Sequence, residues 1–330
     1  MSLSEPLARL AVRSIDDLVG LVPYLIGFHP EASLVAMVLE RGRVAVTARV
    51  DLDAVTDPAA LDQLLARLFG RFPAAEAWFL AYTDDEDLAW EVLDNCVELV
   101  GLVRLGRVLQ VGSRRWRADG PDGATGRISG EVSAAAAHAA VLGLPARSSR
   151  SDLAAGIAGP PDAEVDALLG EFEAQAGELG AMGAGARRRL LRRLLLEPPP
   201  LAFVDCVRLA VLVSSPDGQL AALRAIRWRN AEAHLERWTQ VVRHCLSSAR
   251  AAVLGLLGVA AWQTGDGALQ VVCLEELEKL DPMAPVAGLL QWVNTEVVPP
   301  QAWEDVRPAW LAAVAADLRA GSPPASPQRT

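Results

Sequence analysis

The feature that most constrains the fold is a change in periodicity near residue 145. Before it, short apolar runs of strand length alternate with helical patterns, whereas from Asp162 to about Val298 apolar residues recur at helical spacing only. A chain of 330 residues also exceeds one ordinary hydrophobic core. We therefore expect an α/β domain over residues 1–145, an all-helical domain over 146–320, and a disordered Pro/Ser-rich tail over 321–330.

The clearest local pattern lies in residues 33–52. Residues 33–39 form an almost wholly apolar run, which is typical of a buried strand. After a turn at Arg41-Gly42, residues 43–52 alternate between polar and apolar with a period of two, which predicts a second strand. Two strands joined by so short a turn form a hairpin.

Further helices and strands are expected to flank this hairpin. Ser14 with an acidic residue three positions later predicts a helix that ends at Gly27, and Thr83 with Glu86 predicts a second capped helix reaching about Val100. A helical pattern covers 58–69, strands are expected at 77–82 and 105–111, and a short arm follows at 114–117. Residues 120–130 read as a polar, glycine-rich loop. The expected fold is a mixed α/β sandwich of four or five strands flanked by helices.

Composition limits the kinds of partner and the cellular location expected for this chain. The net charge of -10 repels phosphate backbones, so general nucleic-acid binding is disfavoured. The four cysteines are scattered without C-x-x-C spacing, as expected for buried thiols in a reducing compartment. The N-terminus lacks the pattern of a signal peptide, and the most apolar stretch, 251–262, is too short to span a bilayer. A cytoplasmic location without membrane contact is expected.

Several familiar catalytic motifs are absent from the sequence. Lys279 is the sole lysine, which excludes a G-x-x-x-x-G-K phosphate loop and disfavours Schiff-base chemistry. No G-x-S-x-G elbow occurs, and the four histidines form no i, i+4 ligand pair. No cofactor and no metal site are predicted.

One constellation can still be built at the carboxyl ends of the strands, where open α/β sheets bind ligands. If the second and third strands are parallel neighbours, the side chains that end them converge, and the loop before the first strand reaches the same edge. The candidates for catalysis are His29, Asp51 and Asp84; those for ligand binding are Arg49, Tyr82, Arg115 and Trp116. The alternative interpretation is an ion-paired cap on the sheet, with His29 fastening its loop to a backbone carbonyl.

The helical half contains two candidate interaction surfaces. Residues 187–193 form an amphipathic helix whose arginines, including Arg187, Arg188 and Arg192, could contact nucleic acid or another anionic partner. The alternative is a solvated face balanced by Glu171, Glu173 and Glu178. Residues 249–292 resemble one tetratricopeptide-type hairpin, in which Trp262 either contacts a peptide partner or packs in the core.

Several segments resemble an actinobacterial family known only as domain of unknown function 4192. They are Val22 to Pro30 with Ser33-Leu34-Val35, Ala48 to Leu52, Val108 to Gly112 leading into Arg115-Trp116, Arg147 to Leu153, and Ala261-Trp262 with Gly265 to Ala268 and Asp281-Pro282. Members of this family commonly carry a cysteine shortly after the Arg-Trp pair. Here residues 117–126 contain none, which argues against a metal or redox role for that segment. The resemblance carries no activity.

Three functions remain open. The leading expectation is a non-enzymatic regulatory or interaction protein that docks a protein partner through its helical half and binds a small anionic ligand at the sheet edge. The alternative is a hydrolase or transferase with His29 as acid/base, Asp51 or Asp84 orienting it, and Arg49 holding an anionic group. A second alternative is a nucleic-acid-associated protein acting through the helix at 187–193.

Overall fold

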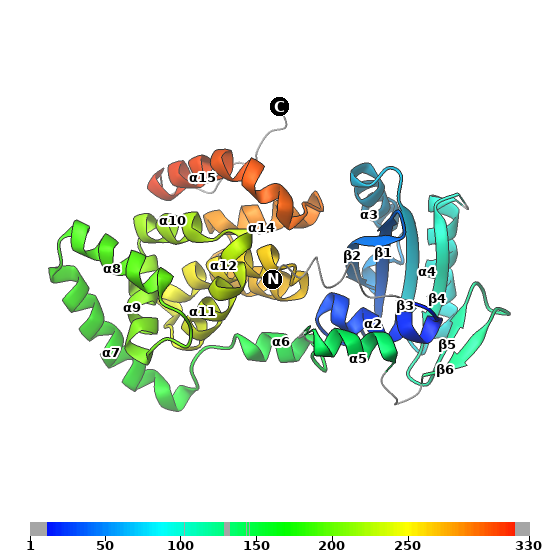
Figure 1. The fold of residues 1–330 in the computed structure, drawn as a ribbon, viewed down its shortest axis with the longest axis horizontal. Helices are drawn as coiled ribbons and strands as arrows, with labels where there is room; N and C mark the ends of the chain where they lie inside the picture. Colours follow the sequence, from blue (N-terminus) through cyan, green and yellow to red (C-terminus); the bar gives the residue numbers. More distant parts are fainter. Residues whose placement is uncertain (1–11, 102, 129–132, 143, 145, 321–330) are drawn as a thin grey trace. The chain divides into compact units, whose positions relative to one another are not determined.

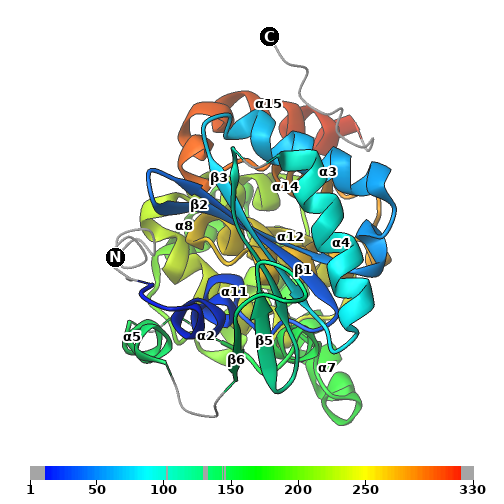
Figure 2. The ribbon, with the colours of Figure 1, turned by 90° about the vertical axis from the view of Figure 1, so that its right-hand side faces the viewer.

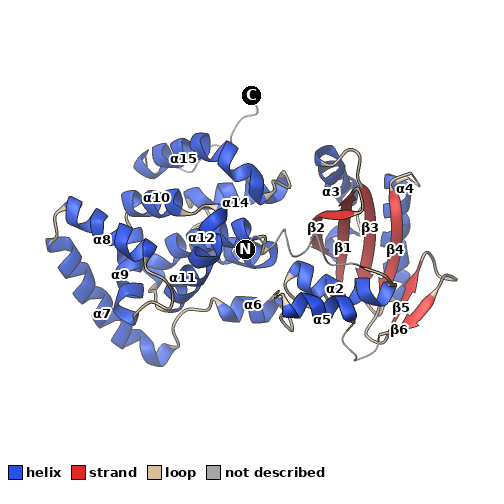
Figure 3. Cartoon of the chain, viewed as in Figure 1, coloured by secondary structure: helices blue, strands red, loops and turns tan. Residues whose placement is uncertain are grey.

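The computed structural model describes residues 12–320, except 102, 129–132, 143 and 145. These residues form two compact units, a sheet unit up to Arg150 and a helical unit from Ser151 onward. Figure 1 traces the elements, and Figure 3 shows strands in the sheet unit alone among the described residues. The tail predicted at 321–330 lies outside the described residues.

The sheet unit opens with helix α2, Ile15–Ile26, whose two ends confirm the sequence prediction. Ser14 is the N-cap, and its hydroxyl accepts a hydrogen bond from the backbone N–H of Asp17. Gly27 ends the helix with φ 84°, a left-handed conformation that glycine adopts without a steric penalty.

The predicted hairpin is present as β1, Ser33–Glu40, and β2, Arg43–Asp51. Arg41 and Gly42 both have positive φ, as a two-residue hairpin turn requires. β1 is buried along most of its length because strands pair with it on both sides. The apolar residues of β2 are half-buried or exposed, because β2 is the edge strand of the sheet.

The middle of the sheet unit is a parallel crossover. After the 3-10 turn Asp53–Val55 and helix α3, Pro58–Arg71, strand β3, Glu76–Tyr82, leads through α4, Glu86–Val100, into the parallel strand β4, Leu105–Val111. The cap of α4 differs from the prediction. Asp85 accepts a hydrogen bond from the N–H of Leu88, whereas the hydroxyl of Thr83 accepts one from the N–H of Asp85.

The sheet has six strands, one more than the predicted upper count. Strand β5, Arg115–Ala118, is the predicted arm, but β6, Thr125–Arg127, lies within the segment interpreted as a glycine-rich loop. The strand order is β2-β1-β3-β4-β5-β6, so β1 lies between β2 and β3. The proposed pairing of the second strand with the third is therefore wrong, although both strands point the same way.

Helices cover both faces of the sheet. α3 and α4 lie on one face, and α2 with α5, Ala134–Val141, lies on the other (Figure 2). Leu21 of α2 packs with Ala135, Ala139 and Leu144 in a small apolar cluster under the second face. Two covered faces explain why β1 and most of β3 carry apolar residues without alternation.

The helical unit contains consecutive helices joined by short turns. They are α6, Arg150–Gly156 (which begins at the boundary), α7, Asp162–Ala181, α8, Ala184–Leu196, α9, Phe203–Val213, α10, Pro216–Ala225, α11, Ala231–Arg243, α12, Ser247–Thr264, α13, Gly267–Leu280, α14, Pro285–Thr295, and α15, Trp303–Ala320. Helices α7 and α8 both pack against α9, while α12 packs against several neighbours in the centre. The fold class, a mixed α/β part followed by a helical part, is confirmed.

α12 and α13 form the helical hairpin predicted from residues 249–292. Gly265 ends α12 with φ 84°, and Asp266 caps α13 by accepting a hydrogen bond from the N–H of Leu269. Trp262 lies in the core, where its indole donates to the carbonyl of Val298 and meets Trp303 edge-to-face at 5.5 Å. A buried indole of this kind packs and does not present a surface.

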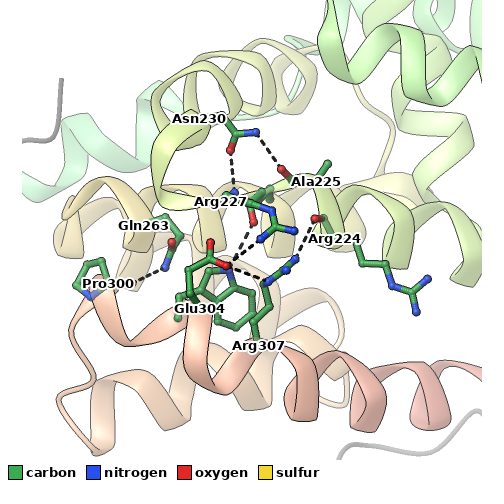
Figure 4. Close-up of polar contacts among 10 residues, drawn as sticks. Arg224, Ala225, Arg227, Asn230, Gln263, Pro300, Glu304 and Arg307 are labelled. Atoms are coloured by element: carbon green, nitrogen blue, oxygen red, sulfur yellow. Dashed lines mark hydrogen bonds and ion pairs between the residues drawn. The ribbon is translucent and has the colours of Figure 1, made fainter.

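A polar network fastens α15 to the turn between α10 and α11 (Figure 4). Glu304 pairs with Arg227 at 2.8 Å, and Arg307 donates to the carbonyl of Arg224. Asn230 closes the turn by bonding the backbone of Arg227 and of Ala225. These contacts join α15 to the turn, which indicates a structural role.

Candidate functional site

An open depression of about 340 Å³ lies at the carboxyl ends of β3 and β4. Its volume falls in the range of small-molecule sites, and its position is the one where open α/β sheets bind ligands. The loops after both strands and the first turn of α4 form its wall. The lining residues are Asp84, Glu86, Gln110, Gly112, Ser113, Arg114 and Arg115.

Asp84 ties the two loops of the depression together. Its carboxylate accepts a hydrogen bond of 2.7 Å from the backbone N–H of Ser113. Hydrogen bonds from the backbone and hydroxyl of Ser113, and the nearby charge of Arg114, lower the pKa of Asp84 below its ordinary value. A side chain at position 112 would lie 2.6 Å from the carboxylate, so Gly112 permits this close approach. Asp84 is thus held ionised.

Glu86 neutralises two arginines of β5. One carboxylate oxygen lies 2.6 Å from Arg115 and the other lies 3.4 Å from Arg117. Glu86 is also the first residue of α4, where the helix dipole favours a negative charge. The ion pair holds Arg115 at the rim of the depression. Because Glu86 neutralises its charge, Arg115 attracts an anionic ligand less strongly.

Gln110 is the group in the depression that lacks a full set of partners. It is 2% exposed, and its amide N–H donates to the carbonyl of Thr83 at 2.7 Å. Its amide oxygen is buried and has no hydrogen-bond partner among the described residues. An unpaired buried acceptor costs about 1–3 kcal/mol. The oxygen is closed off from solvent, so a ligand donor would reach it only after the Gln110 side chain turns towards the depression. The sequence analysis missed Gln110, whose one signal is a polar residue between Leu109 and Val111 of a buried strand.

Arg114 and Ser113 complete the depression with exposed groups. The guanidinium of Arg114 has no ion pair within the described part of the chain, although its charge acts on the nearby carboxylate of Asp84. It follows directly on the ordered Asp84–Ser113 contact. A free arginine beside a buried unpaired acceptor can bind a molecule that carries both an anionic group and a donor.

Arg49 and Asp51 form the ion pair that the sequence analysis weighed as a structural alternative. Their side chains meet at 2.5 Å, and Arg49 also donates to the hydroxyl of Ser33 and stacks near the ring of Phe28. Strand register pairs Asp51 with Ser33 and Ser33 with Tyr82, which places these side chains on the face that α2 covers. Gln110 pairs with Ala81 and therefore projects from the opposite face.

Tyr82 and Trp116 belong to the same face as Arg49. Register aligns Tyr82 with Val111 and Val111 with Trp116, whose indole donates to Asp16 of α2 at 2.7 Å. Burial raises the pKa of Tyr82, and its hydroxyl has no partner among the described groups. The predicted ligand-binding set is thus divided by the sheet, with Arg115 on one face and Arg49, Tyr82 and Trp116 on the other.

His29 lies at the predicted edge, before β1, with an exposed side chain. The contact that fastens its loop is made by the backbone: the N–H of His29 donates to the carbonyl of Arg147 at 3.0 Å. Arg147 in turn donates to the carbonyl of Gly27. The expected side-chain bond to a carbonyl is replaced by this short backbone ladder, which joins two of the segments that carry the family resemblance.

The basic segment of the helical unit is present as α8. Arg187 is half-buried and donates to the carbonyls of Leu179 and Met182, whereas Arg188 and Arg192 are exposed. The acids expected to balance this face are engaged elsewhere or exposed. Glu171 accepts from Gln175, Glu178 pairs with Arg208, and Glu173 points to solvent.

Among the described residues, no group of three or more His, Cys, Asp or Glu side chains could hold a metal ion. The four cysteines are free and buried, and burial raises the pKa of the Cys96 thiol to about 12. Among the helices that the structure describes, none is long and apolar enough to cross a membrane.

Comparison with known proteins identifies the family. The family model described as a domain of unknown function, DUF4192, matches residues 16–301. The match covers most of the chain, so the protein belongs to the DUF4192 family, as the sequence resemblance indicated. No curated protein and no solved structure matches the chain.

Proposed function

We propose that this protein is a non-enzymatic regulatory protein that binds a small anionic ligand in the depression at the ends of β3 and β4. The observation that carries the proposal is a depression of ligand size at the carboxyl ends of β3 and β4, which Gln110 and Arg114 both line. Arg114 supplies an exposed positive charge that has no ion pair in the described part of the chain. The ligand would place an anionic group on Arg114 and an N–H or O–H donor on Gln110.

A binding role agrees with the charges around the site better than catalysis does. The lowered pKa of Asp84 makes its carboxylate a poor proton acceptor near neutral pH, because a general base works best with a pKa near the operating pH. Glu86 is occupied by two arginines. His29 lies outside the set of residues that line the depression.

The location we propose is the cytoplasm, in an actinobacterial host as the family resemblance implies. Four free, buried thiols support a reducing compartment, where cysteines stay unpaired. A small ligand that reports a metabolic state to a protein partner would be present in the cytoplasm.

Ligand binding can be tested with a defined panel of amino and hydroxy carboxylates, measured by thermal shift and isothermal titration calorimetry. We expect a subset to bind the wild type and to lose at least about tenfold in affinity with Arg114→Ala or Gln110→Leu. Arg71→Ala, which removes an exposed arginine at the end of α3, is the control. Binding that survives both site variants would contradict the proposal, as would failure of the whole panel to bind.

A further inference from the structure

Two consecutive helices of the helical unit carry opposite charges that do not meet. The acidic face of α7 consists of Asp162, Asp166, Leu169 and Glu173, which recur at i, i+4, i+7 and i+11 and therefore share one side of the helix. All four are exposed, and the three carboxylates have no ion pair within the described residues.

The basic face of α8 is the counterpart. It consists of Arg188, Arg189, Arg192, Arg193 and Leu196, all exposed. No ion pair or side-chain hydrogen bond in the described part of the chain engages the four arginines. Arg187, one residue before them, shows the contrast, because it turns inward and bonds two carbonyls at the end of α7. The four arginines are therefore left for a partner outside the unit.

The two faces match in pattern as well as in sign. Each has one exposed leucine among its charges, Leu169 at 44% and Leu196 at 76% exposure. At a rise of 1.5 Å per residue, Asp166 and Glu173 are about 10 Å apart along α7 and the arginines of α8 span about 8 Å, so both acids can be bridged together. Beside the acids, α7 exposes small residues that let a second helix approach closely: Ala163, Ala167, Gly170, Ala174 and Gly177.

We infer that α7 and α8 form a self-association surface, in which the basic face of α8 packs on the acidic face of α7 of a second copy of this chain. Each copy offers one face of each sign, so two reciprocal contacts close a two-fold dimer without leaving either face open. Both helices pack on α9, which leaves their outer faces turned away from the core of the unit. The inference is independent of ligand binding in the sheet unit.

A second copy fits these faces better than nucleic acid does. A polyanion would engage the arginines alone and would be repelled by the acidic face of the neighbouring helix and by the net charge of -10. A second copy satisfies both faces. It also covers both leucines, which a phosphate backbone would leave in water.

Charge reversal of the full-length protein tests the inference by sedimentation analysis at low salt and about 100 µM, where a micromolar dimer is almost fully formed. Wild type is expected to be dimeric. Arg188→Glu/Arg192→Glu leaves the basic face of α8 without net charge, because Arg189 and Arg193 remain. Asp166→Arg/Glu173→Arg gives the acidic face of α7 a net positive charge, because only Asp162 remains. Each variant alone is expected to be mostly monomeric at this concentration, which corresponds to a dissociation constant raised from the micromolar range by about a thousandfold.

An equimolar mixture of the two variants is expected to dimerise more strongly than either variant alone. In the mixed dimer the basic face of α8 from the second variant meets the acidic face of α7 from the first, so one of the two contacts has the wild-type charges. The matched control is Arg67→Glu/Arg71→Glu, which reverses two exposed arginines at the same i, i+4 spacing on α3 and should stay dimeric. Circular dichroism reports whether a charge reversal disturbs folding. If it does, the milder variant Arg188→Gln/Arg192→Gln, which is also expected to weaken the dimer, replaces it.

A monomeric wild type would overturn the inference, as would reversed variants that stay dimeric or a mixture that stays monomeric. A monomeric wild type that binds duplex DNA through Arg188 and Arg192 would overturn it too and assign the basic face of α8 to nucleic acid.

Discussion

The sheet unit and the helical unit use their charged side chains differently. Around the depression, Asp84 and Glu86 are both engaged by groups of the same unit, Asp84 by Ser113 and Glu86 by two arginines. On α7 and α8, charges of both signs are exposed and unpaired within the described residues. This difference indicates which charged side chains are available to a ligand or a partner. Paired charges at the sheet edge shape a site, whereas unpaired charges on helix faces are available to a partner.

The physical reason is the cost of removing a charge from water. At the sheet edge the loops crowd together, and a carboxylate there is stable only if backbone N–H groups or arginines replace its water. On an exposed helix face water does this at no cost, so the fold does not require a partner. Unpaired surface charge is thus tolerated by the monomer and can be used for association.

A third arrangement lies inside the helical unit. His234 and Arg237 of α11 are 1% and 2% exposed, and Arg237 bonds the carbonyls of Ala233 and Glu197. Glu197 ends α8, where the helix dipole places partial negative charge. A buried arginine held by carbonyls fastens α11 to the end of α8.

The largest effect should come from removing that buried arginine. Arg237→Ala leaves the carbonyl of Glu197 without its donor and opens a cavity, and we expect it to lower the free energy of unfolding by about 3 kcal/mol. Arg192→Ala, the exposed counterpart on α8, should change it by less than about 0.5 kcal/mol. Urea denaturation followed by circular dichroism measures both. Similar losses for the two variants would break the distinction between inner and outer arginines.

The buried His234 predicts that the free energy of unfolding depends on pH. Burial, assisted by the charge of Arg237, lowers the pKa of His234 from 6.5 to about 4. The unfolded chain therefore binds more protons than the folded chain between these values. The stabilisation is complete above about pH 6.5 and is lost as the pH falls towards 4, by up to about 3 kcal/mol.

The variant His234→Gln separates this effect from the titration of carboxylates. Its unfolding free energy should decline less than that of wild type between pH 6.5 and pH 4, measured by urea denaturation at each pH. Parallel profiles for the two proteins would mean that His234 titrates normally in the fold.

The smallest expected effect on stability comes from removing one carboxylate in each unit. Glu86→Ala leaves Arg115 and the half-buried Arg117 unpaired, and it should cost about 1 kcal/mol. Glu173→Ala on α7 removes a solvated carboxylate and should cost less than about 0.3 kcal/mol for the monomer. Thermal unfolding at low protein concentration compares the pair. An equal cost would show that the sheet-edge pairing contributes no more than solvation does.

Local structure in the sheet unit was largely predictable. The cap at Ser14, the stop at Gly27 and the hairpin around Arg41-Gly42 each depend on residues within one turn or one strand, where side-chain chemistry decides the backbone. The helix at 86–100 was also predicted, but its N-cap is Asp85 and not Thr83, because the Asp85 carboxylate accepts from the N–H of Leu88 while the Thr83 hydroxyl accepts from the N–H of Asp85.

The site was predicted only in part. The sequence indicated the edge of the sheet where the depression lies and included Asp84 and Arg115, which line it. It also assigned Arg49 and Asp51 to the same site, although these project from the other face. Gln110 was not predicted as a site residue, because a single polar residue in a strand cannot be assigned to a site until it is known which face of the sheet each side chain occupies.

The sequence by itself determined the elements, their caps and the change from an alternating α/β pattern to helices alone, because these depend on near neighbours along the chain. Only the tertiary structure decided the order β2-β1-β3, the short strand β6, and the division of the candidate residues between two faces. Strand pairing joins residues far apart in sequence, and a side chain changes face with every residue. The charges of α7 and α8 were visible in the sequence, but which of them the fold leaves unpaired was not.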